Sequence, residues 1–182
     1  MRLLRLPLPE ADSPFGIRHS TFPVAALPHT HSCFVCGESN AHGLRLRFTT
    51  DGQHVHTRFT PRADHIGFKA VTHGGLLATV LDEIMVWAVA VGTRRFAYCA
   101  ELTVRFHQPA KVDAELLAAG ELVSNRRGKL FEAKAELRDA SGQVVATATG
   151  KYLPVPAGEI PAMLTELVGD RSVIESGISP AP

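Results

Sequence analysis

Residues 73–91 decide the fold, and they read HGGLLATVLDEIMVWAVAV. Apart from Asp82 and Glu83, the stretch from Leu76 to Val91 is almost wholly apolar. It is shorter than the roughly 20 residues that a membrane-spanning helix needs, and it carries both acids near its middle. A helix without a polar face has to be covered on nearly all sides. We therefore expect one long helix in the core of a folded domain, and no membrane span.

Segments with alternating apolar and polar residues lie on both sides of this helix. Leu44–Phe48 and His54–Phe59 precede it, and Asp51-Gly52 is a hairpin turn signal between them. Further strands are expected at Glu101–Phe106, Val112–Leu122, Leu130–Leu137 and Val144–Tyr152. Short turns separate the later strands, which favours antiparallel pairing. The sequence thus predicts an α+β fold, in which a curved antiparallel sheet wraps around one long central helix.

Both ends of the chain are interrupted by proline and lack periodicity. We divide the chain into an N-terminal arm (residues 1–30), a folded domain (31–155) and a C-terminal tail (156–182) in which 160–168 is expected to form a short helix. The first ten residues lack the continuous apolar run of a signal peptide.

Composition limits the classes of function. The 182 residues suit one globular domain, with 45% apolar and 20% charged residues. The net charge is +1, which argues against a broad basic surface and a nucleic-acid partner. The three cysteines cannot all pair, so we expect a reducing compartment and a cytoplasmic protein.

Two glycines stand where the central helix is expected to begin. Gly74 and Gly75 have no Cβ, so a ligand can approach the backbone closely. The first turn of a helix also has unpaired N–H groups and partial positive charge. Such N–H groups can hold a carbonyl oxygen and stabilise negative charge that develops on it.

Asp82 follows Gly75 by two helical turns and returns to nearly the same helix face. Acids among apolar neighbours are rarely idle, so Asp82 is a candidate general base for water or a candidate nucleophile. It lies about 10 Å from the glycines along one helix, too far to share a reacting centre. Two antiparallel helices in a symmetric dimer would bring the glycines of one protomer to the partner's acid. For the neighbouring Glu83 we expect a solvent or interface position.

At these residues the chain resembles the hotdog-fold thioesterases, specifically the PaaI-like branch of the 4-hydroxybenzoyl-CoA thioesterase superfamily. The resemblance covers about residues 31–155. The matching segments are Cys33–Gly37, Asn40, Gly43–Phe48, Gly67–Glu83, Glu101–Phe106 with Pro109, and Gly150. The His-Gly-Gly tripeptide alone is a weak signal, whereas the whole ordered set is a specific one.

The resemblance implies the hotdog fold and hydrolysis of an acyl-CoA thioester to a carboxylic acid and free CoA. It implies no metal and no separate cofactor, since coenzyme A is part of the substrate. It also implies a homodimer, or a tetramer built as a dimer of dimers, with active sites at the subunit interface. By position, a Gly74 or Gly75 N–H would polarise the thioester carbonyl, and His73 would shape that loop. Asp82 from the partner would activate water or attack the carbonyl.

Three further positions follow from the resemblance. Cys99 falls where many members have a Ser or Thr that assists the water, and its thiol is a poorer hydrogen-bonding group for that task. Some relatives place an Asn in the loop before His-Gly-Gly, and here Asp64 and His65 are the two alternatives for substrate binding.

Two other groups of residues have alternative interpretations. Arg126, Arg127 and Lys129 form a loop-borne cluster that would bind the phosphates of CoA or would be ordinary solvated charge. Cys33 and Cys36 form a lone Cys-x-x-Cys motif, which is a weak match to a zinc site. We interpret the two cysteines as small side chains that pack the start of the first strand.

Two rival functions fit the same fold. A hydratase or dehydratase of acyl thioesters would use a His with an acid on the helix, but His73 precedes the glycines, which disfavours this assignment. A non-catalytic acyl-CoA-binding protein would bind thioesters without turnover and would tolerate loss of Asp82. The sequence favours the acyl-CoA thioesterase.

Overall fold

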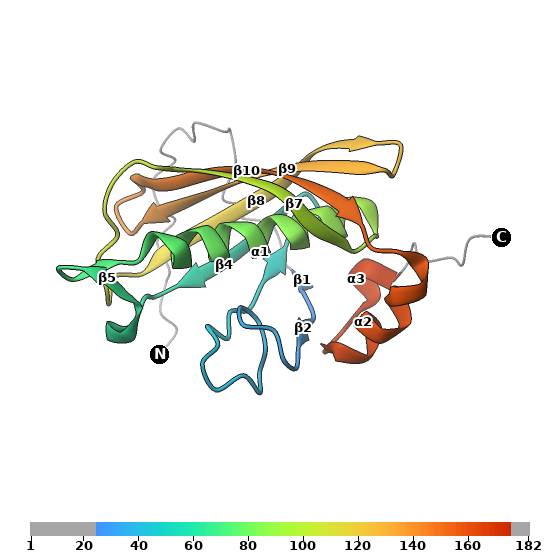
Figure 1. Cartoon of the computed structure of the whole chain (residues 1–182), viewed down its shortest axis with the longest axis horizontal. Coiled ribbons are helices and arrows are strands. Elements are labelled where there is room, and N and C mark those ends of the chain that lie inside the picture. Colours follow the sequence, from blue (N-terminus) through green and yellow to red (C-terminus); the bar gives the residue numbers. More distant parts are fainter. Residues whose placement is uncertain (1–24, 176–182) are drawn as a thin grey trace, which may run out of the picture.

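Helix α1 runs from Gly74 to Thr93 and lies along one face of a seven-stranded sheet (Figure 1). The structure is a computed structural model and describes residues 25–175. Its helix begins two residues before the apolar stretch, because the His73 side chain caps it by accepting a hydrogen bond from the Gly75 N–H. It ends where Arg94 takes a left-handed conformation and donates its N–H to the Ala90 carbonyl.

The sheet is antiparallel throughout, with strand order β1-β3-β4-β8-β9-β10-β7. Its strands are β1 (Ala25–Ala26), β3 (Thr49–Thr50), β4 (His54–Phe59), β8 (Leu116–Arg126), β9 (Leu130–Asp139), β10 (Val144–Pro154) and β7 (Ala97–Phe106). Two short ribbons flank it: β2 (His29–Thr30) pairs with β11 (Leu167–Val168), and β5 (Ile66–Phe68) pairs with β6 (Val71–Thr72). The remaining elements are η1 (Ala63–His65), η2 (Ala157–Glu159), α2 (Ile160–Glu166) and α3 (Ser172–Glu175).

The core lies between α1 and the sheet. Alternate residues of β9 face α1 and are buried, as the sequence predicts for Phe131, Ala133, Ala135 and Leu137. In β8, a Cβ on Gly120 would lie 3.3 Å from the Ile84 Cγ2, so the glycine lets the helix approach the strand closely. The predicted curved antiparallel sheet around one helix is confirmed.

The opposite side of α1 is covered by residues 33–48, which run past the helix before β3 (Figure 1). The Phe48 ring lies 6.2 Å from the Trp87 ring, and both side chains are buried. By length and composition α1 could cross a membrane, and it is the one helix within residues 25–175 that could. Its cover on both sides gives it the position of a core helix.

Two predicted strands are wrong in part. Leu44, Leu46 and Phe48 are buried and alternate with exposed arginines, yet 44–48 is outside the sheet. A positive φ of 54° at Arg45 interrupts the extended backbone there. Likewise, Asp113 has a φ of 61°, and β8 begins only at Leu116 instead of Val112.

The other elements agree with the sequence. Gly52 (φ 94°) lies in the β3–β4 hairpin, and the Asp51 carboxylate accepts hydrogen bonds from two backbone N–H groups of that turn. The short helix predicted at 160–168 is α2, and its last two residues form β11 instead. Residues 1–24 of the predicted N-terminal arm and 176–182 of the tail lie outside the described residues.

Replacement of Val55 by Ala tests which face of the sheet is the core. Val55 in β4 is fully buried, so Val55→Ala should lower the free energy of unfolding by about 2 kcal/mol through lost burial and a cavity. Val123 in the neighbouring β8 is 56% exposed. Val123→Ala should therefore change the free energy of unfolding by no more than about 0.5 kcal/mol. Urea unfolding followed by circular dichroism measures both, and equal losses would contradict the assignment of the faces.

Candidate active site

The N-terminus of α1 carries a backbone N–H that is free to donate a hydrogen bond. The Gly75 N–H donates to the His73 Nδ1 at 3.0 Å, and the Leu76 N–H donates to the His73 carbonyl at 2.9 Å. Within the described part of the chain, the Gly74 N–H has no such partner. Of the two predicted glycines, Gly74 therefore presents a free N–H at the positive end of the helix.

Neighbouring elements fix the geometry of this end. The His73 N–H donates to the His65 carbonyl at 2.9 Å, which ties the start of α1 to the end of η1. A Cβ on Gly67 would lie 2.9 Å from the His73 Cα, so β5 also packs closely on this residue. A Cβ on Gly74 would lie 3.2 Å from the ring of Phe106, the last residue of β7. Any other residue at position 74 would push against that ring.

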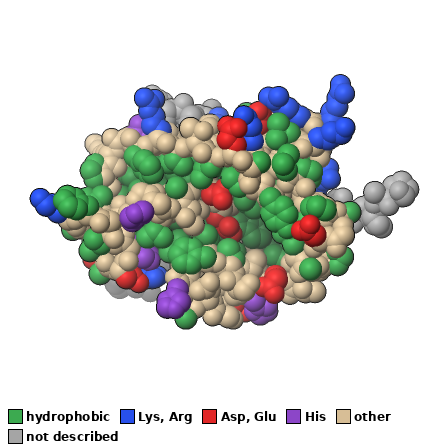
Figure 2. Space-filling model, viewed as in Figure 1, with side chains coloured by type: hydrophobic (Ala, Val, Ile, Leu, Met, Phe, Trp, Pro, Cys, Tyr) green, Lys and Arg blue, Asp and Glu red, His purple; other side chains and the backbone are tan. Residues whose placement is uncertain are grey.

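Large exposed apolar side chains lie on elements near the glycines. They are Phe106, whose ring is beside Gly74, and Ile66 and Phe68 of β5, and they are 51%, 47% and 73% exposed. Figure 2 shows hydrophobic side chains spread over the face that carries α1, with Lys and Arg mostly at its edge. Large apolar side chains exposed together on one face are typical of an interaction or ligand-binding surface.

Asp82 lies on the sheet side of α1, next to two polar side chains. The buried Tyr152 of β10 donates its hydroxyl to the Asp82 Oδ1 at 3.0 Å. The Cys99 thiol of β7 lies close enough to the Asp82 carboxylate to feel its charge, and it donates to the Glu101 carbonyl at 3.7 Å. Partial burial and the Asp82 carboxylate raise the pKa of Cys99 to about 11, and the same two causes raise the pKa of Tyr152. Both groups are therefore protonated at neutral pH, and Tyr152 acts as a donor to the acid.

The sequence does not predict the role of Tyr152. A usable signal is that a tyrosine in a buried strand needs a hydrogen-bond partner for its hydroxyl. Two local features aim the pair at Asp82. The β10–β7 register passes from Lys151↔Glu101 to Tyr152↔Cys99, so Ala100 is an extra residue in a bulge, which re-aims Cys99. A Cβ on Gly150 would lie 2.6 Å from the Tyr152 ring, so glycine leaves room for this side chain.

Asp82 and Gly74 do not meet within one protomer. Seven to eight residues separate the acid from the glycines on one unbroken helix, a distance of about 10 Å along its axis. The chain thus carries the amide donor and the carboxylate at two separate places on α1.

The two alternatives in the preceding loop have different surroundings. His65 is buried, its Nδ1 accepts the Arg62 N–H at 3.0 Å, and burial lowers its pKa. Asp64 is exposed, and its hydrogen bond to Arg62 lowers its pKa. These contacts give His65 a structural position, whereas the Asp64 carboxylate faces solvent.

The basic cluster lies at the opposite end of α1 from the glycines. Arg126, Arg127 and Lys129 belong to the β8–β9 hairpin, which contacts the far end of the helix where Arg95 donates to the Gly128 carbonyl at 2.8 Å. Arg126 pairs with Glu132 at 2.9 Å. The structure therefore does not bring this cluster to the glycines or to Asp82 of the same protomer.

Glu83 does not occupy the expected solvent position. Its carboxylate faces residues 33–36, opposite to the sheet, and accepts a hydrogen bond from the Trp87 Nε1 at 3.2 Å. Burial, followed by the nearby Cys33, raises the pKa of Glu83 to about 7. The expectation failed because residues 33–48 cover a helix face that the sequence pattern leaves without a partner.

Comparison with known proteins agrees with this architecture. Residues 70–146 match the family model of the thioesterase superfamily. No curated protein matches the chain. A solved thioesterase superfamily protein is 28% identical with a TM-score of 0.62, and the match covers 68% of this chain but only 60% of that protein. These findings confirm the resemblance to the thioesterase superfamily and the hotdog fold.

Two other solved structures share the fold at lower identity. The E. coli PaaI protein, from a phenylacetic acid degradation operon, is 18% identical over 62% of this chain and 81% of its own, with a TM-score of 0.57. A Streptococcus mutans protein bound to acetyl-CoA is 21% identical over 57% of this chain and 82% of its own, with a TM-score of 0.53.

The contact between Cys99 and Asp82 predicts the reactivity of the thiol. The negative carboxylate disfavours the thiolate, so Asp82→Asn should lower the pKa of Cys99 from about 11 toward its ordinary value. Since the thiolate is the reactive form, alkylation of Cys99 at pH 8.5 should become roughly three- to tenfold faster. Site-resolved mass spectrometry after timed treatment with iodoacetamide measures the rate.

The matched control is Glu101→Gln, which removes an exposed carboxylate that pairs with Lys151. It should leave the alkylation rate of Cys99 unchanged. An Asp82→Asn protein that reacts as slowly as the wild type would show that the carboxylate does not act on this thiol.

Proposed function

We propose that this protein is an acyl-CoA thioesterase whose active site forms between two protomers. The observation that carries the proposal is the pair of separated half-sites on α1, namely the free N–H of Gly74 and the Asp82 carboxylate held by Tyr152. The likeness to thioesterase superfamily proteins, one of them solved with acetyl-CoA bound, supports this class of substrate.

Strand β7 offers the surface for such a dimer. It is the last strand of the sheet and pairs with β10 on one side only, within the described residues. An edge strand of ten residues is a ready template for pairing with a second copy. Pairing of two β7 strands about a two-fold axis would set the two α1 helices antiparallel and place the exposed Tyr98 and Phe106 in the interface.

The two half-sites then form one reacting centre. The Gly74 N–H of one protomer donates to the thioester carbonyl oxygen and stabilises its negative charge during attack. Asp82 of the partner accepts a proton from a water molecule that attacks the carbonyl carbon, or attacks that carbon itself. In both cases the carbon–sulfur bond breaks and the CoA sulfur takes up a proton. When water attacks, the acyl group leaves directly as the carboxylic acid; when Asp82 attacks, a mixed anhydride forms on Asp82 and water then hydrolyses it to the carboxylic acid and free Asp82.

The surrounding residues have distinct roles in this scheme. His73 uses its Nδ1 to cap the Gly75 N–H, which positions the first turn and leaves Gly74 as the donor to the carbonyl. Tyr152 orients the Asp82 carboxylate by donating to it, and the Cys99 thiol lies beside the carboxylate. Asp64, exposed on the loop beside His73, is available to the substrate, whereas His65 supports the loop.

The basic cluster fits the phosphates of CoA in the same dimer. In the proposed dimer, Asp82 of one α1 lies beside Gly74 of the partner's antiparallel α1. The helix that carries this Asp82 continues to Thr93, about 16 Å beyond the partner's glycine. The β8–β9 hairpin with Arg126, Arg127 and Lys129 lies at this end. A long, flexible CoA arm could therefore place its thioester at Gly74 and its phosphates at the partner's hairpin.

Replacement of Asp82 by Asn tests the catalytic acid. Asp82→Asn should lower kcat/KM for acyl-CoA hydrolysis by at least about 100-fold, because the amide cannot accept the proton from water. Thiol release over a panel of acyl-CoAs measures the loss, and CoA affinity should stay within a few-fold of wild type. Glu115→Gln, an exposed acid beside Arg58, is the control and should keep full activity.

Two outcomes would contradict the function. Full turnover in Asp82→Asn would remove Asp82 from the mechanism. Tight binding of acyl-CoA by the wild type without thiol release for any acyl group would identify a non-catalytic acyl-CoA-binding protein instead.

A mixing experiment tests whether the site is shared. Gly74→Val fills the space beside the Phe106 ring and should block the carbonyl site, so it should be inactive alone, as should Asp82→Asn. In a mixed dimer, the Asp82→Asn chain supplies an intact Gly74 and the Gly74→Val chain supplies an intact Asp82. Random reassortment should restore about a quarter of the wild-type activity, from half the dimers with one site each.

The control is each variant unfolded and refolded alone, which should stay inactive. Complete inactivity of the mixture, with mixed dimers verified by native mass spectrometry, would show that the two half-sites do not come from different protomers.

A further inference from the structure

Cys33 and Cys36 lie on one tight turn of the chain that ends at Gly37. The Gly37 N–H donates to the Cys33 carbonyl at 2.9 Å and closes the turn, and the Val35 N–H donates to the Cys33 Sγ at 3.2 Å. A Cβ on Gly37 would lie 2.3 Å from the Cys33 carbonyl oxygen, so only glycine allows this closure. The turn therefore presents two sulfur atoms together, one of which already accepts a backbone hydrogen bond.

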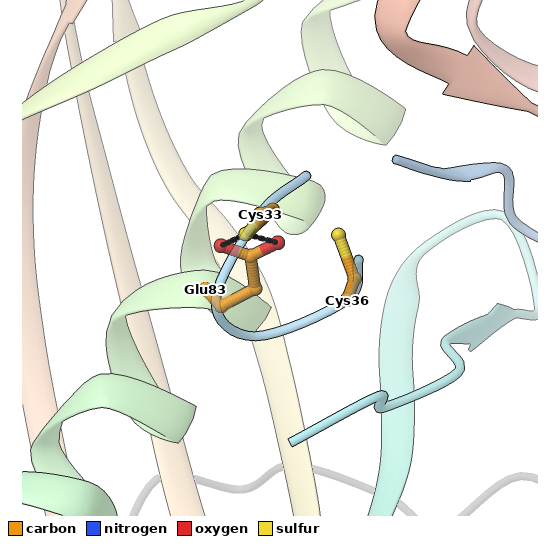
Figure 3. Close-up of side chains that lie close together, drawn as sticks. All are labelled: Cys33, Cys36 and Glu83. Atoms are coloured by element: carbon orange, nitrogen blue, oxygen red, sulfur yellow. Dashed lines mark hydrogen bonds between the residues drawn. The ribbon is translucent and has the colours of Figure 1, made fainter. Parts of the chain in front are cut away.

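Glu83 reaches this turn from the middle of α1 (Figure 3). Its two carboxylate oxygens lie 3.9 and 4.0 Å from the Cys33 Sγ, and the Trp87 Nε1 fixes one of them. One ligand atom from each of Cys33, Cys36 and Glu83 lies within 4.8 Å of the other two. Zinc binds sulfur at about 2.3 Å and carboxylate oxygen at about 2.0–2.2 Å, so ligand atoms around one tetrahedral ion lie roughly 3.5–4 Å apart.

Within residues 25–175, no positively charged side chain pairs with the carboxylate at this place. Among the described residues, Glu83 makes no ion pair with a Lys, Arg or His side chain. The Nη1 of Arg47 donates hydrogen bonds to the backbone carbonyls of residues 36, 45 and 46. Cys36 is fully buried, and a carboxylate beside two thiols in such surroundings is stabilised when a cation joins it.

We propose that Cys33, Cys36 and Glu83 form a binding site for a thiophilic divalent cation, of which Zn²⁺ fits the donor set best. Two thiolates and one carboxylate suit Zn²⁺, whereas Mg²⁺ and Ca²⁺ prefer oxygen ligands alone. Binding releases the two thiol protons, and a solvent molecule would complete a tetrahedron. The sequence alone predicted no metal, because a lone Cys-x-x-Cys lacks the third ligand that α1 supplies.

This site is separate from the proposed active site. Successive residues of a helix point about 100° apart, so Asp82 faces Tyr152 of the sheet while Glu83 faces residues 33–36. A bound ion would clamp the covering segment 33–48 onto α1. Its consequence is structural, and its presence can be tested without any measurement of hydrolysis.

A second cluster, Asp51, His54 and His56, has a similar spacing of its ligand atoms. There, however, His54 already pairs with Asp51 at 3.2 Å and with Glu121 at 3.0 Å. These histidine–carboxylate pairs account for the geometry without an ion, so this cluster serves as a control.

Metal content of the purified full-length protein tests the proposal. Protein prepared without chelators and analysed by inductively coupled plasma mass spectrometry should contain about one Zn²⁺ per chain. Chelator-treated protein titrated with Co²⁺ should develop the thiolate-to-cobalt absorption band. Cys33→Ser and Glu83→Gln should each weaken Co²⁺ binding at least tenfold, whereas Cys99→Ser and His54→Gln should leave it unchanged.

Protection of the wild-type thiols keeps the test valid if a variant fails to fold. Zn²⁺ added to the chelator-treated wild type should slow alkylation of Cys33 at least tenfold and leave Cys99 unaffected. The proposal is overturned if the reduced wild type binds neither Zn²⁺ nor Co²⁺, or if Cys33→Ser keeps the wild-type affinity. A Cys33–Cys36 disulfide in protein purified under reducing conditions would also overturn it, in favour of a redox pair.

Discussion

The structure depends on the need to cover one apolar helix. The sheet covers one side of α1, where Ile84 packs against the glycine of β8 and alternate residues of β9 are buried. Residues 33–48 cover a second side and bring Phe48 to Trp87. A third stripe of the helix, with Gly75, Thr79 and Val86, stays partly exposed. The two acids in the middle of α1 each face one of the two covers.

Two consecutive acids show what this enclosure does. Asp82 turns toward the sheet, where the Tyr152 hydroxyl donates to it and the Cys99 thiol lies nearby. Glu83 turns toward the other cover, where it lies beside two thiols and accepts the indole N–H of Trp87. Two consecutive residues of one helix thus carry the carboxylate that we propose for proton transfer and the carboxylate that we propose as a metal ligand.

The sequence predicts what depends on local pattern and does not predict what depends on contacts between distant residues. Helix α1, the hairpin at Asp51-Gly52 and the buried face of β9 follow from periodicity and turn chemistry. The 44–48 segment has the alternation of a strand, but the positive φ of Arg45 keeps it out of the ladder. That backbone angle leaves no mark in the hydrophobic pattern.

The same limit applies to the site. Gly74, Gly75, His73 and Asp82 are close in sequence, so their relation on one helix could be worked out from helical geometry. Tyr152 lies 70 residues from Asp82, and a bulge in β7 sets the register that brings Cys99 beside them. Glu83 meets Cys33 across 50 residues. These partners are decided by strand register and by how the N-terminal segment covers α1.

The rigidity of α1 links the proposed chemistry to assembly. An unbroken helix keeps Gly74 and Asp82 about 12 Å apart along its axis, and no loop between them could close that gap. A protomer can therefore bind a carbonyl at one place and hold an acid at another, but it cannot bring both to one thioester. Two antiparallel copies remove the obstacle without moving any residue of the helix. On this geometry, hydrolysis should appear only when the β7 edges of two protomers have paired.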